Sequence, residues 1–318
     1  MVMQIGVIRN CKKYLGLSLV LVIISIAVLI FKGLNYGIDF SGGNLIQVKF
    51  ENNITLKEIN SVLDNVAKEV PQLSPNSRKV QVSEDNTVII RSQELSEAQK
   101  EIVLEDLKEV GTYKLDKVDK VGASIGKELK TSAIYSLAIG TVLIILYITL
   151  RFEFLFSIGA VTALLHDIII AVGVIAILGY EVDTPFIAAV LTILGYSINN
   201  TIVVFDRVRE NLRRKTKEKL SFEEILDRSI NQVMIRTINT SVTTLFAIVA
   251  ILIFGGDSLR TFIVTLLVGI LAGTYSSIFV ATSIMYLLDR KKTKNGGSGI
   301  EKKLQREEKK ESKEKIVV

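Results

Sequence analysis

Six long apolar runs are the feature that most constrains what this chain can fold into. They lie at about 14–31, 133–150, 154–179, 185–205, 234–254 and 262–288. Each is close to or above the roughly 20 mostly apolar residues that a helix needs to cross the hydrocarbon core of a bilayer. Charged residues make up 23% of the chain but gather between the runs, which excludes a single soluble core. The sequence therefore predicts a polytopic α-helical membrane protein with six transmembrane helices.

Basic residues beside these runs predict the orientation. Lysine and arginine gather before the first span in residues 1–13, after the fourth in a loop at 206–233, and after the sixth in a tail at 289–318. The short connections at 180–184 and 255–260 are nearly free of them. Because basic flanks stay on the cytoplasmic side of a cell membrane, we expect both termini and this loop to be cytoplasmic. We expect the tail to be disordered.

Residues 32–130 have the pattern of a folded domain between the first two spans. Residues 44–50 alternate as a strand does, and 55–70 carry apolar residues at helical spacing. Strand patterns follow at 79–82 and 87–91, then a second helix at 95–110 and a last strand at 113–121. The order βαββαβ is that of a ferredoxin-like unit. We therefore expect an α+β ferredoxin-like extracytoplasmic domain.

Composition makes several kinds of site poor expectations. One cysteine and one histidine cannot form a disulfide, a Cys/His zinc cluster or a Cys-His nucleophile pair. The chain has no Walker-type phosphate loop, and its net charge of +6 is explained by membrane topology better than by a nucleic-acid partner. We expect no enzymatic activity, no cofactor, no metal site and no nucleic acid.

Polar side chains interrupt three of the spans and are the first candidates for function, because ionisable groups in a membrane are costly. Several recur at spacings of three or four residues, so each set can face a neighbouring helix. We predict a polar seam between the spans, in which Asn200 and Arg236 lie at depths that permit contact. Its candidates are His166, Asp167, Asn199, Asn200, Asp206, Arg236, Thr240 and Thr244.

Structural interpretations stand beside this one. Serine, threonine and asparagine in spans are more often hydrogen-bond glue between helices, and Arg236 can reach the cytoplasmic surface as an anchor. His166 and Asp167 point about 100° apart on a helix and are expected to use other partners. Gly269 and Gly273 form a GxxxG pattern that predicts close helix packing. Gly42 and Gly43 predict a tight turn.

Four motifs in order carry a family resemblance. They are GIDFSGG at 37–43, GYSINNTIVVFDRVREN at 195–211, RTINTSVTT at 236–244 and GTYSSIFVA at 273–281. Together they closely resemble the SecF members of the SecD/SecF family, within the RND superfamily. The resemblance implies an RND-type half-transporter of the bacterial cell membrane that pairs with SecD and associates with SecYEG. It would use the proton gradient to help draw the preprotein substrate across.

One connection is expected to couple the membrane helices to the external domain. It contains Gly37, Asp39, Phe40, Gly42 and Gly43. Span motion transmitted through it would move the domain against a partner, which requires a two-state element biased by protonation.

The chain departs from the family pattern at one position. Asn200 stands where the family commonly has an aspartate that works with an arginine matching Arg236, and an amide cannot titrate. Three explanations remain: another carboxylate such as Asp167, Asp206 or one from SecD serves instead, the coupling ion differs, or coupling is lost. The alternatives to the leading function are a small-molecule RND exporter half and a structural assembly subunit without ion coupling.

Overall fold

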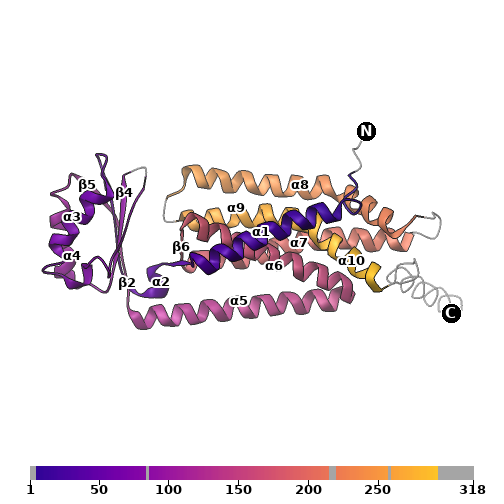
Figure 1. Cartoon of the computed structure of the whole chain (residues 1–318), viewed down its shortest axis with the longest axis horizontal. Coiled ribbons are helices and arrows are strands. Elements are labelled where there is room, and N and C mark those ends of the chain that lie inside the picture. The colour runs from indigo at the N-terminus through magenta and orange to yellow at the C-terminus, as the bar shows by residue number, and fades with distance from the viewer. Residues whose placement is uncertain (1–4, 84–85, 215–219, 257–258, 293–318) are drawn as a thin grey trace. The chain divides into compact units, whose positions relative to one another are not determined.

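The computed structural model describes residues 5–83, 86–214, 220–256 and 259–292. The chain divides into two compact units (Figure 1). The helical unit contains residues up to Asn35, Ser136–Glu181 and the chain from Pro185 onward. The second unit contains Tyr36–Tyr135 and Val182–Thr184. The expected tail lies outside the described residues from 293 onward, as do residues 215–219 of the expected loop.

Within the described ranges, six helical segments are long and apolar enough to span a membrane. Five are continuous helices, and the sixth is interrupted by a π-helical turn at Ser276–Val280. Their bounds are α1 Cys11–Phe31, α5 Ala123–Arg151, α6 Phe154–Leu178, α7 Thr184–Arg214, α8 Phe222–Phe254, α9 Arg260–Tyr275 and α10 Ala281–Lys292.

Several helices extend beyond the apolar runs that predict them. Helix α5 begins at Ala123 instead of 133, and α7 and α8 take up most of the 206–233 segment that we expected to be a loop. The start of α8 is fixed by a capping box, in which Ser221 and Glu224 satisfy each other's backbone N–H groups. An apolar run marks the part of a helix that lies in lipid, whereas caps and amphipathic ends set its full length.

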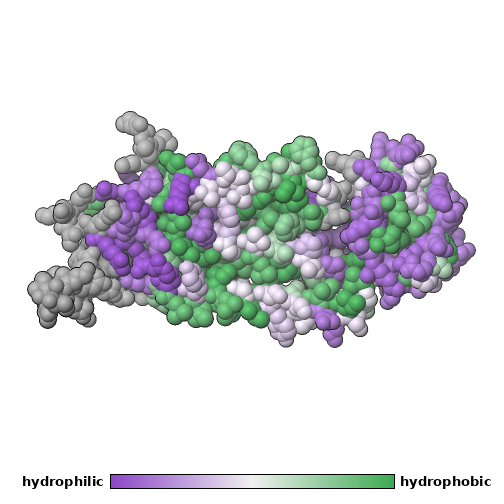
Figure 2. All heavy atoms as spheres, turned by 180° about the vertical axis from the view of Figure 1, so that it is seen from behind, coloured by the Kyte–Doolittle hydropathy of each residue, from purple (hydrophilic) through white to green (hydrophobic). Residues whose placement is uncertain are grey.

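Helices α6, α7 and α9–α10 form the centre of the helical unit. About half of their apolar spans is buried, whereas α1, α5 and α8 remain largely exposed. A buried cluster that includes Phe156, Ala160, Phe205 and Met285 packs these helices together. Figure 2 shows apolar residues gathered along the helical unit and flanked by hydrophilic ones. Exposed apolar helices of this kind face lipid or another membrane protein.

The second unit is a four-stranded antiparallel sheet with the order β3-β4-β2-β5. Its elements are β2 Gly43–Phe50, α3 Leu56–Val66, a 3-10 turn Pro71–Leu73, β3 Lys79–Val82, β4 Thr87–Ser92, α4 Glu97–Leu107 and β5 Tyr113–Val121. The chain order and the sheet order are those of a ferredoxin-like fold, as predicted. Val48, Ile59 and Val103 are fully buried between the sheet and the two helices.

A short connector leads from α1 to this sheet. It contains β1 Asn35–Tyr36 and α2 Ile38–Ser41. Strand β1 pairs with β6 Glu181–Val182, which joins α6 to α7.

Candidate functional site

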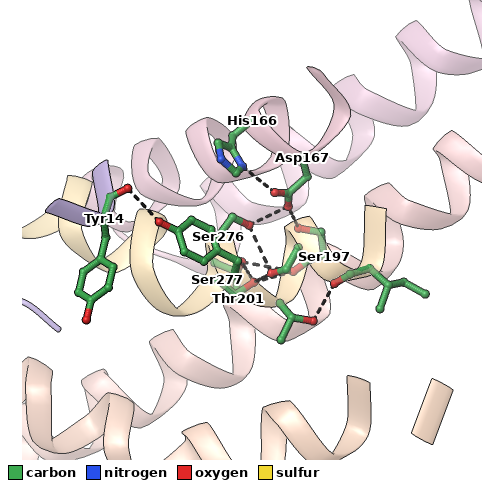
Figure 3. Close-up of polar contacts among 11 residues, drawn as sticks. Tyr14, His166, Asp167, Ser197, Thr201, Ser276 and Ser277 are labelled. Carbon is green, nitrogen blue, oxygen red and sulfur yellow. Dashed lines mark hydrogen bonds and ion pairs between the residues drawn. The ribbon is translucent and has the colours of Figure 1, made fainter. Parts of the chain in front are cut away.

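A buried carboxylate lies at the middle of α6. Asp167 is fully buried and accepts hydrogen bonds on Oδ2 from the Ser197 hydroxyl of α7 at 2.5 Å and from the Ser276 hydroxyl at 2.8 Å. Its Oδ1 lies 2.9 Å from His166 Nδ1. Figure 3 shows these side chains converging from three helices. We call Asp167, His166, Ser197 and Ser276 the Asp167 cluster.

The π-helical turn brings two consecutive serines into this region. Ser276 and Ser277 are both fully buried. Ser277 Oγ lies 2.9 Å from Thr201 Oγ1 of α7 and donates to the Gly273 carbonyl at 2.7 Å. A π turn widens a helix locally and is often found at functional sites. Here the interruption of the sixth span lies beside the buried carboxylate.

The histidine of the cluster has one unused ring nitrogen. His166 is buried, and its Nε2 has no hydrogen-bond partner among the described residues. Its ring stacks on Tyr275 with centroids 6.3 Å apart, and the Tyr275 hydroxyl donates to the Tyr14 carbonyl at 2.9 Å. We expected His166 and Asp167 to use other partners. Asp167 does bind Ser197 and Ser276, but it also contacts His166, because side-chain torsion lets the imidazole reach the carboxylate next to it.

The predicted contact between Asn200 and Arg236 is not made. Asn200 is buried, and its Nδ2 has no partner among the described residues, whereas Arg236 and the neighbouring Asn199 are exposed. The physical reason is rotation about the helix axes, since Arg236 lies on the outer face of α8. Helices α7 and α8 meet through other polar groups: Tyr196 donates to Ser241 at 3.2 Å, and Thr274 of α9 donates to the same serine at 2.7 Å.

The exposed face of α8 carries polar groups among apolar ones. Its exposed polar residues are Arg236, Asn239, Thr240 and Thr243. Its exposed apolar residues include Ile235, Ile238, Val242 and Phe246. Thr240 and Thr244 donate to backbone carbonyls one turn back, at 2.9 and 3.0 Å. Within the described ranges no carboxylate pairs with Arg236. We call this surface the Arg236 face.

Asp206 lies apart from both sets. It is half-exposed near the end of α7, with Arg151 Nη2 3.6 Å and Arg209 Nη1 3.9 Å from its Oδ1. The predicted seam residues therefore do not form one seam: they divide among the Asp167 cluster, the Arg236 face and the end of α7, and Asn199 and Asn200 lie elsewhere on α7.

The glycines of the sixth span lie against α7. A Cβ on Gly269 would overlap the Ile193 side chain. A Cβ on Gly273 would lie 3.0 Å from Ser197 Cβ and 3.3 Å from Asp167 Oδ2. Gly273 thus lets the backbone approach the Asp167 cluster. The sequence reasoning missed Ser197, Thr201, Ser276 and Ser277, although the spacing of four between Ser197 and Thr201 marks one helix face.

The connector binds the C-terminal end of α6 through a lysine and the N-terminal end of α7 through an aspartate. Within the helical unit, Lys32 Nζ donates to the Ile177 carbonyl at 2.7 Å and Asn35 Nδ2 to the Gly179 carbonyl at 3.1 Å. Within the second unit, the first N–H of α7, from Thr184, donates to Asp39 Oδ2 at 2.9 Å. A cation at a helix C-terminus and an anion at an N-terminus both complement the helix dipole.

Three glycines of the connector make close backbone contacts. They are Gly37, Gly42 and Gly43. Gly37 N donates to the Val182 carbonyl at 3.0 Å, and Phe40 N donates to the Gly37 carbonyl at 3.2 Å in the turn that begins α2. Gly42 and Gly43 have φ values of +71° and +113°. A Cβ on Gly43 would overlap the Ser92 carbonyl oxygen, and one on Gly42 would lie 3.1 Å from Ala123 Cα at the start of α5.

No group of three or more His, Cys, Asp or Glu side chains that could hold a metal ion occurs in the part of the chain that the structure describes. The Asp167 cluster offers one carboxyl group, one imidazole and hydroxyl groups. That set can accept and release a proton or change its hydrogen bonds.

Comparison with known proteins matches most of the chain to one family. The family model described as "Protein export membrane protein SecD/SecF, C-terminal" matches residues 102–291, and the "SecD/SecF GG Motif" model matches residues 27–54. The second range contains the connector, and the first contains the Asp167 cluster.

Relatives and solved structures agree with this match. The chain is 48% identical to a protein translocase subunit SecF of Sebaldella termitidis, covering 92% of this chain and 96% of that one. It is 38% identical to the SecF of Haemophilus influenzae, covering 85% and 82%. The crystal structure of SecDF, a translocon-associated membrane protein from Thermus thermophilus, matches with a TM-score of 0.80 at 34% identity. That match covers 90% of this chain, which spans 39% of the SecDF chain.

Proposed function

The chain belongs to the SecF family of protein translocase subunits, multi-pass proteins of the bacterial inner membrane, and on this premise we propose how it contributes to export. We propose that it acts with SecD beside the SecYEG channel and uses the transmembrane ion gradient to promote preprotein movement. The coupling ion passes through the Asp167 cluster, where it neutralises the carboxylate and changes its hydrogen bonds.

One observation carries this proposal. Asp167 is a fully buried carboxyl group at the middle of a membrane span, held by hydroxyl groups from α7 and the sixth span. A buried ionisable group in a membrane is expensive and marks a functional site by default. Since Asn200 has an amide where the family commonly has a carboxyl group, Asp167 is the group in this chain best placed to take up the coupling ion.

The cluster also has the parts of a two-state switch. Asp167 holds α6 to α7 and to the π turn through Ser197 and Ser276. Neutralising the carboxylate weakens both hydrogen bonds, because bonds to an ionised acceptor are about twice as strong as neutral ones. Uptake of the coupling ion by Asp167 thereby biases how α6, α7 and the sixth span pack together.

The Arg236 face supports the partnership with SecD. An arginine in a membrane span needs an acid or a water-filled cavity, and Arg236 pairs with no carboxylate among the described residues. A SecD helix that carries a carboxylate would cover this face. The apolar side chains around Arg236 match such a helix in character.

The connector supports coupling to the external domain. Lys32, Asn35 and Asp39 bind the ends of α6 and α7, and these two helices carry His166, Asp167 and Ser197. A shift of α6 against α7 would pull on the strand that leads into the sheet. On this proposal the domain at 32–130 lies outside the membrane and both termini lie in the cytoplasm.

Complementation tests the function. In cells that lack their own SecF, we expect the chain to restore secretion of a reporter preprotein. Asp167→Asn should reach the membrane and bind SecD but leave secretion at the level of cells without the chain. Asp206→Asn is the matched control, since it makes the same change outside the cluster. If Asp206→Asn fails and Asp167→Asn works, the coupling acid lies at the end of α7; if both work, the coupling acid comes from SecD or the chain is an assembly subunit.

A further inference from the structure

A pocket rich in arginine lies in the helical unit, where α5 and α7 end. It has a volume of about 480 Å³ and is lined by Arg151, Asp206, Arg209, Glu210 and Arg213. Arg151 is the last residue of α5, and the other four come from the final turns of α7. None of them belongs to the Asp167 cluster. We call this the arginine pocket.

Its positive charge exceeds what its own acids neutralise. Glu210 is bound by Arg207, which lies outside the lining, at 2.5 Å. Asp206 is 3.6 Å from Arg151 and 3.9 Å from Arg209, too far for a hydrogen bond to either. Exposed Arg213 makes no ion pair with any described residue. Three arginines against Asp206 leave two positive charges, which favours an anionic ligand.

An aromatic ring fixes two of these arginines. The guanidinium carbons of Arg151 and Arg209 lie 5.4 and 5.6 Å from the centre of the Phe152 ring. Phe152 is itself buried against Phe156 and Phe205. Stacking of this kind leaves the guanidinium edges able to donate hydrogen bonds. The ring therefore holds two of the three arginines of the pocket as preorganised donors.

The surface beside the pocket is apolar. Leu143, Leu146 and Leu150 share one face of α5 and are 58%, 52% and 78% exposed, and Phe154 is 66% exposed. At the end of a membrane span such a strip would face lipid acyl chains, and the topology proposed above would place the pocket at headgroup level on the side with the basic flanks. We propose that the arginine pocket binds the phosphate of an anionic phospholipid whose acyl chains lie along this strip.

Fluorescence quenching provides the test, because the chain contains no tryptophan. Leu150→Trp places one reporter beside the pocket in the full-length chain, reconstituted in nanodiscs of phosphatidylcholine. Brominated phosphatidylglycerol is compared with brominated phosphatidylcholine at the same low mole fraction. We expect the pocket to prefer the anionic lipid by roughly fivefold for each arginine that faces the lipid, and this lipid to quench correspondingly more.

Substitutions in the reporter chain connect the preference to the pocket. Arg209→Gln with Arg213→Gln should remove most of it, and Arg213→Gln alone should lower it about fivefold. The single variant keeps the test valid if the double variant does not fold, because the Arg213 side chain is exposed and makes no ion pair with any described residue. Lys12→Gln with Lys13→Gln is the matched control: it removes the same charge from the same end of the helical unit and should keep the preference.

Three outcomes would overturn the proposal. Equal quenching by the two lipids would mean that no anionic headgroup occupies the pocket. An equal loss in the Lys12 and Lys13 control would reduce the effect to general charge attraction. Displacement of the anionic lipid by millimolar inorganic phosphate would assign the pocket to a soluble anion instead of a lipid.

Discussion

At the scale of single residues, a few close approaches decide what the chain can do. The sequence pointed to Asp167 and His166, because an ionisable pair in an apolar run is conspicuous. It did not point to Ser197 or Ser276, because hydroxyl groups in spans are common and usually serve packing. Their role depends on helix rotation and on a π turn, which residue spacing alone does not predict.

The close approach of Gly43 to the Ser92 carbonyl oxygen can be tested by substitution. Gly43→Ala should destabilise the full chain by about 2–4 kcal/mol, because the new methyl group meets the Ser92 carbonyl and φ is +113°. Thermal unfolding in detergent measures the loss. Gly122→Ala is the control, since a Cβ there meets nothing within 4 Å. Equal melting temperatures of the two variants would contradict the close approach of Gly43 to the Ser92 carbonyl.

At the scale of elements, long apolar runs and apolar periodicity predicted most of the fold. The six spans lie where long apolar runs place them, and the six elements of the ferredoxin-like domain lie where periodic apolar residues place them. Helix ends were the weak point. The extensions of α5, α7 and α8 run through polar residues whose helical state depends on caps such as Ser221 and Glu224.

The connector gives a prediction for coupling. Asp39→Asn should reduce secretion while membrane level and SecD binding stay normal. The change removes the negative charge at the start of α7 and should cost only about 0.5–1 kcal/mol of stability. Reporter secretion and a melting curve measure the two effects. Asp116→Asn on exposed β5 is the matched control, and full secretion by Asp39→Asn would refute coupling through this contact.

The capping box of α3 gives a prediction for pH. Hydrogen bonds from the backbone and hydroxyl of Thr55 lower the pKa of Glu58 below its usual range. A lowered carboxyl pKa stabilises the fold above the ordinary glutamate pKa of about 4.3, and this contribution is lost as the pH falls through the folded-state pKa. Carbon-13 titration of the Glu58 carboxyl measures it. Thr55→Val keeps the backbone N–H and removes only the hydroxyl, so it should move the pKa part of the way back up. A Glu58 pKa that is not lowered in the unsubstituted chain would contradict the capping box.

At the scale of the whole molecule, the chain has surfaces that its own residues do not complete. Largely exposed apolar helices and an unmatched arginine in a span are features of a subunit. Sequence motifs were enough to predict the family and the fold. They could not predict which face meets a partner, because Asn200 and Arg236 were expected to meet each other and instead point to different surroundings.

Arg236 gives the prediction at this scale. Arg236→Met keeps the length and apolar stem of the side chain but removes its charge. We expect the variant to insert normally and to lose most of its recovery with SecD, because a carboxylate of the partner would be left unpaired in the membrane. Arg260→Met, at the opposite end of the helical unit, is the control. Unchanged recovery together with full secretion would make Arg236 an anchor at the membrane surface.

The most direct test of the account measures gradient dependence in a defined system. Proteoliposomes that contain SecYEG, SecD and this chain would translocate a reporter preprotein with and without an imposed ion gradient. We predict that the gradient accelerates translocation with the unsubstituted chain and with Asp206→Asn, and has no effect with Asp167→Asn, whose gradient-independent translocation persists. Full acceleration with Asp167→Asn would contradict the claim that ion coupling passes through the buried carboxylate.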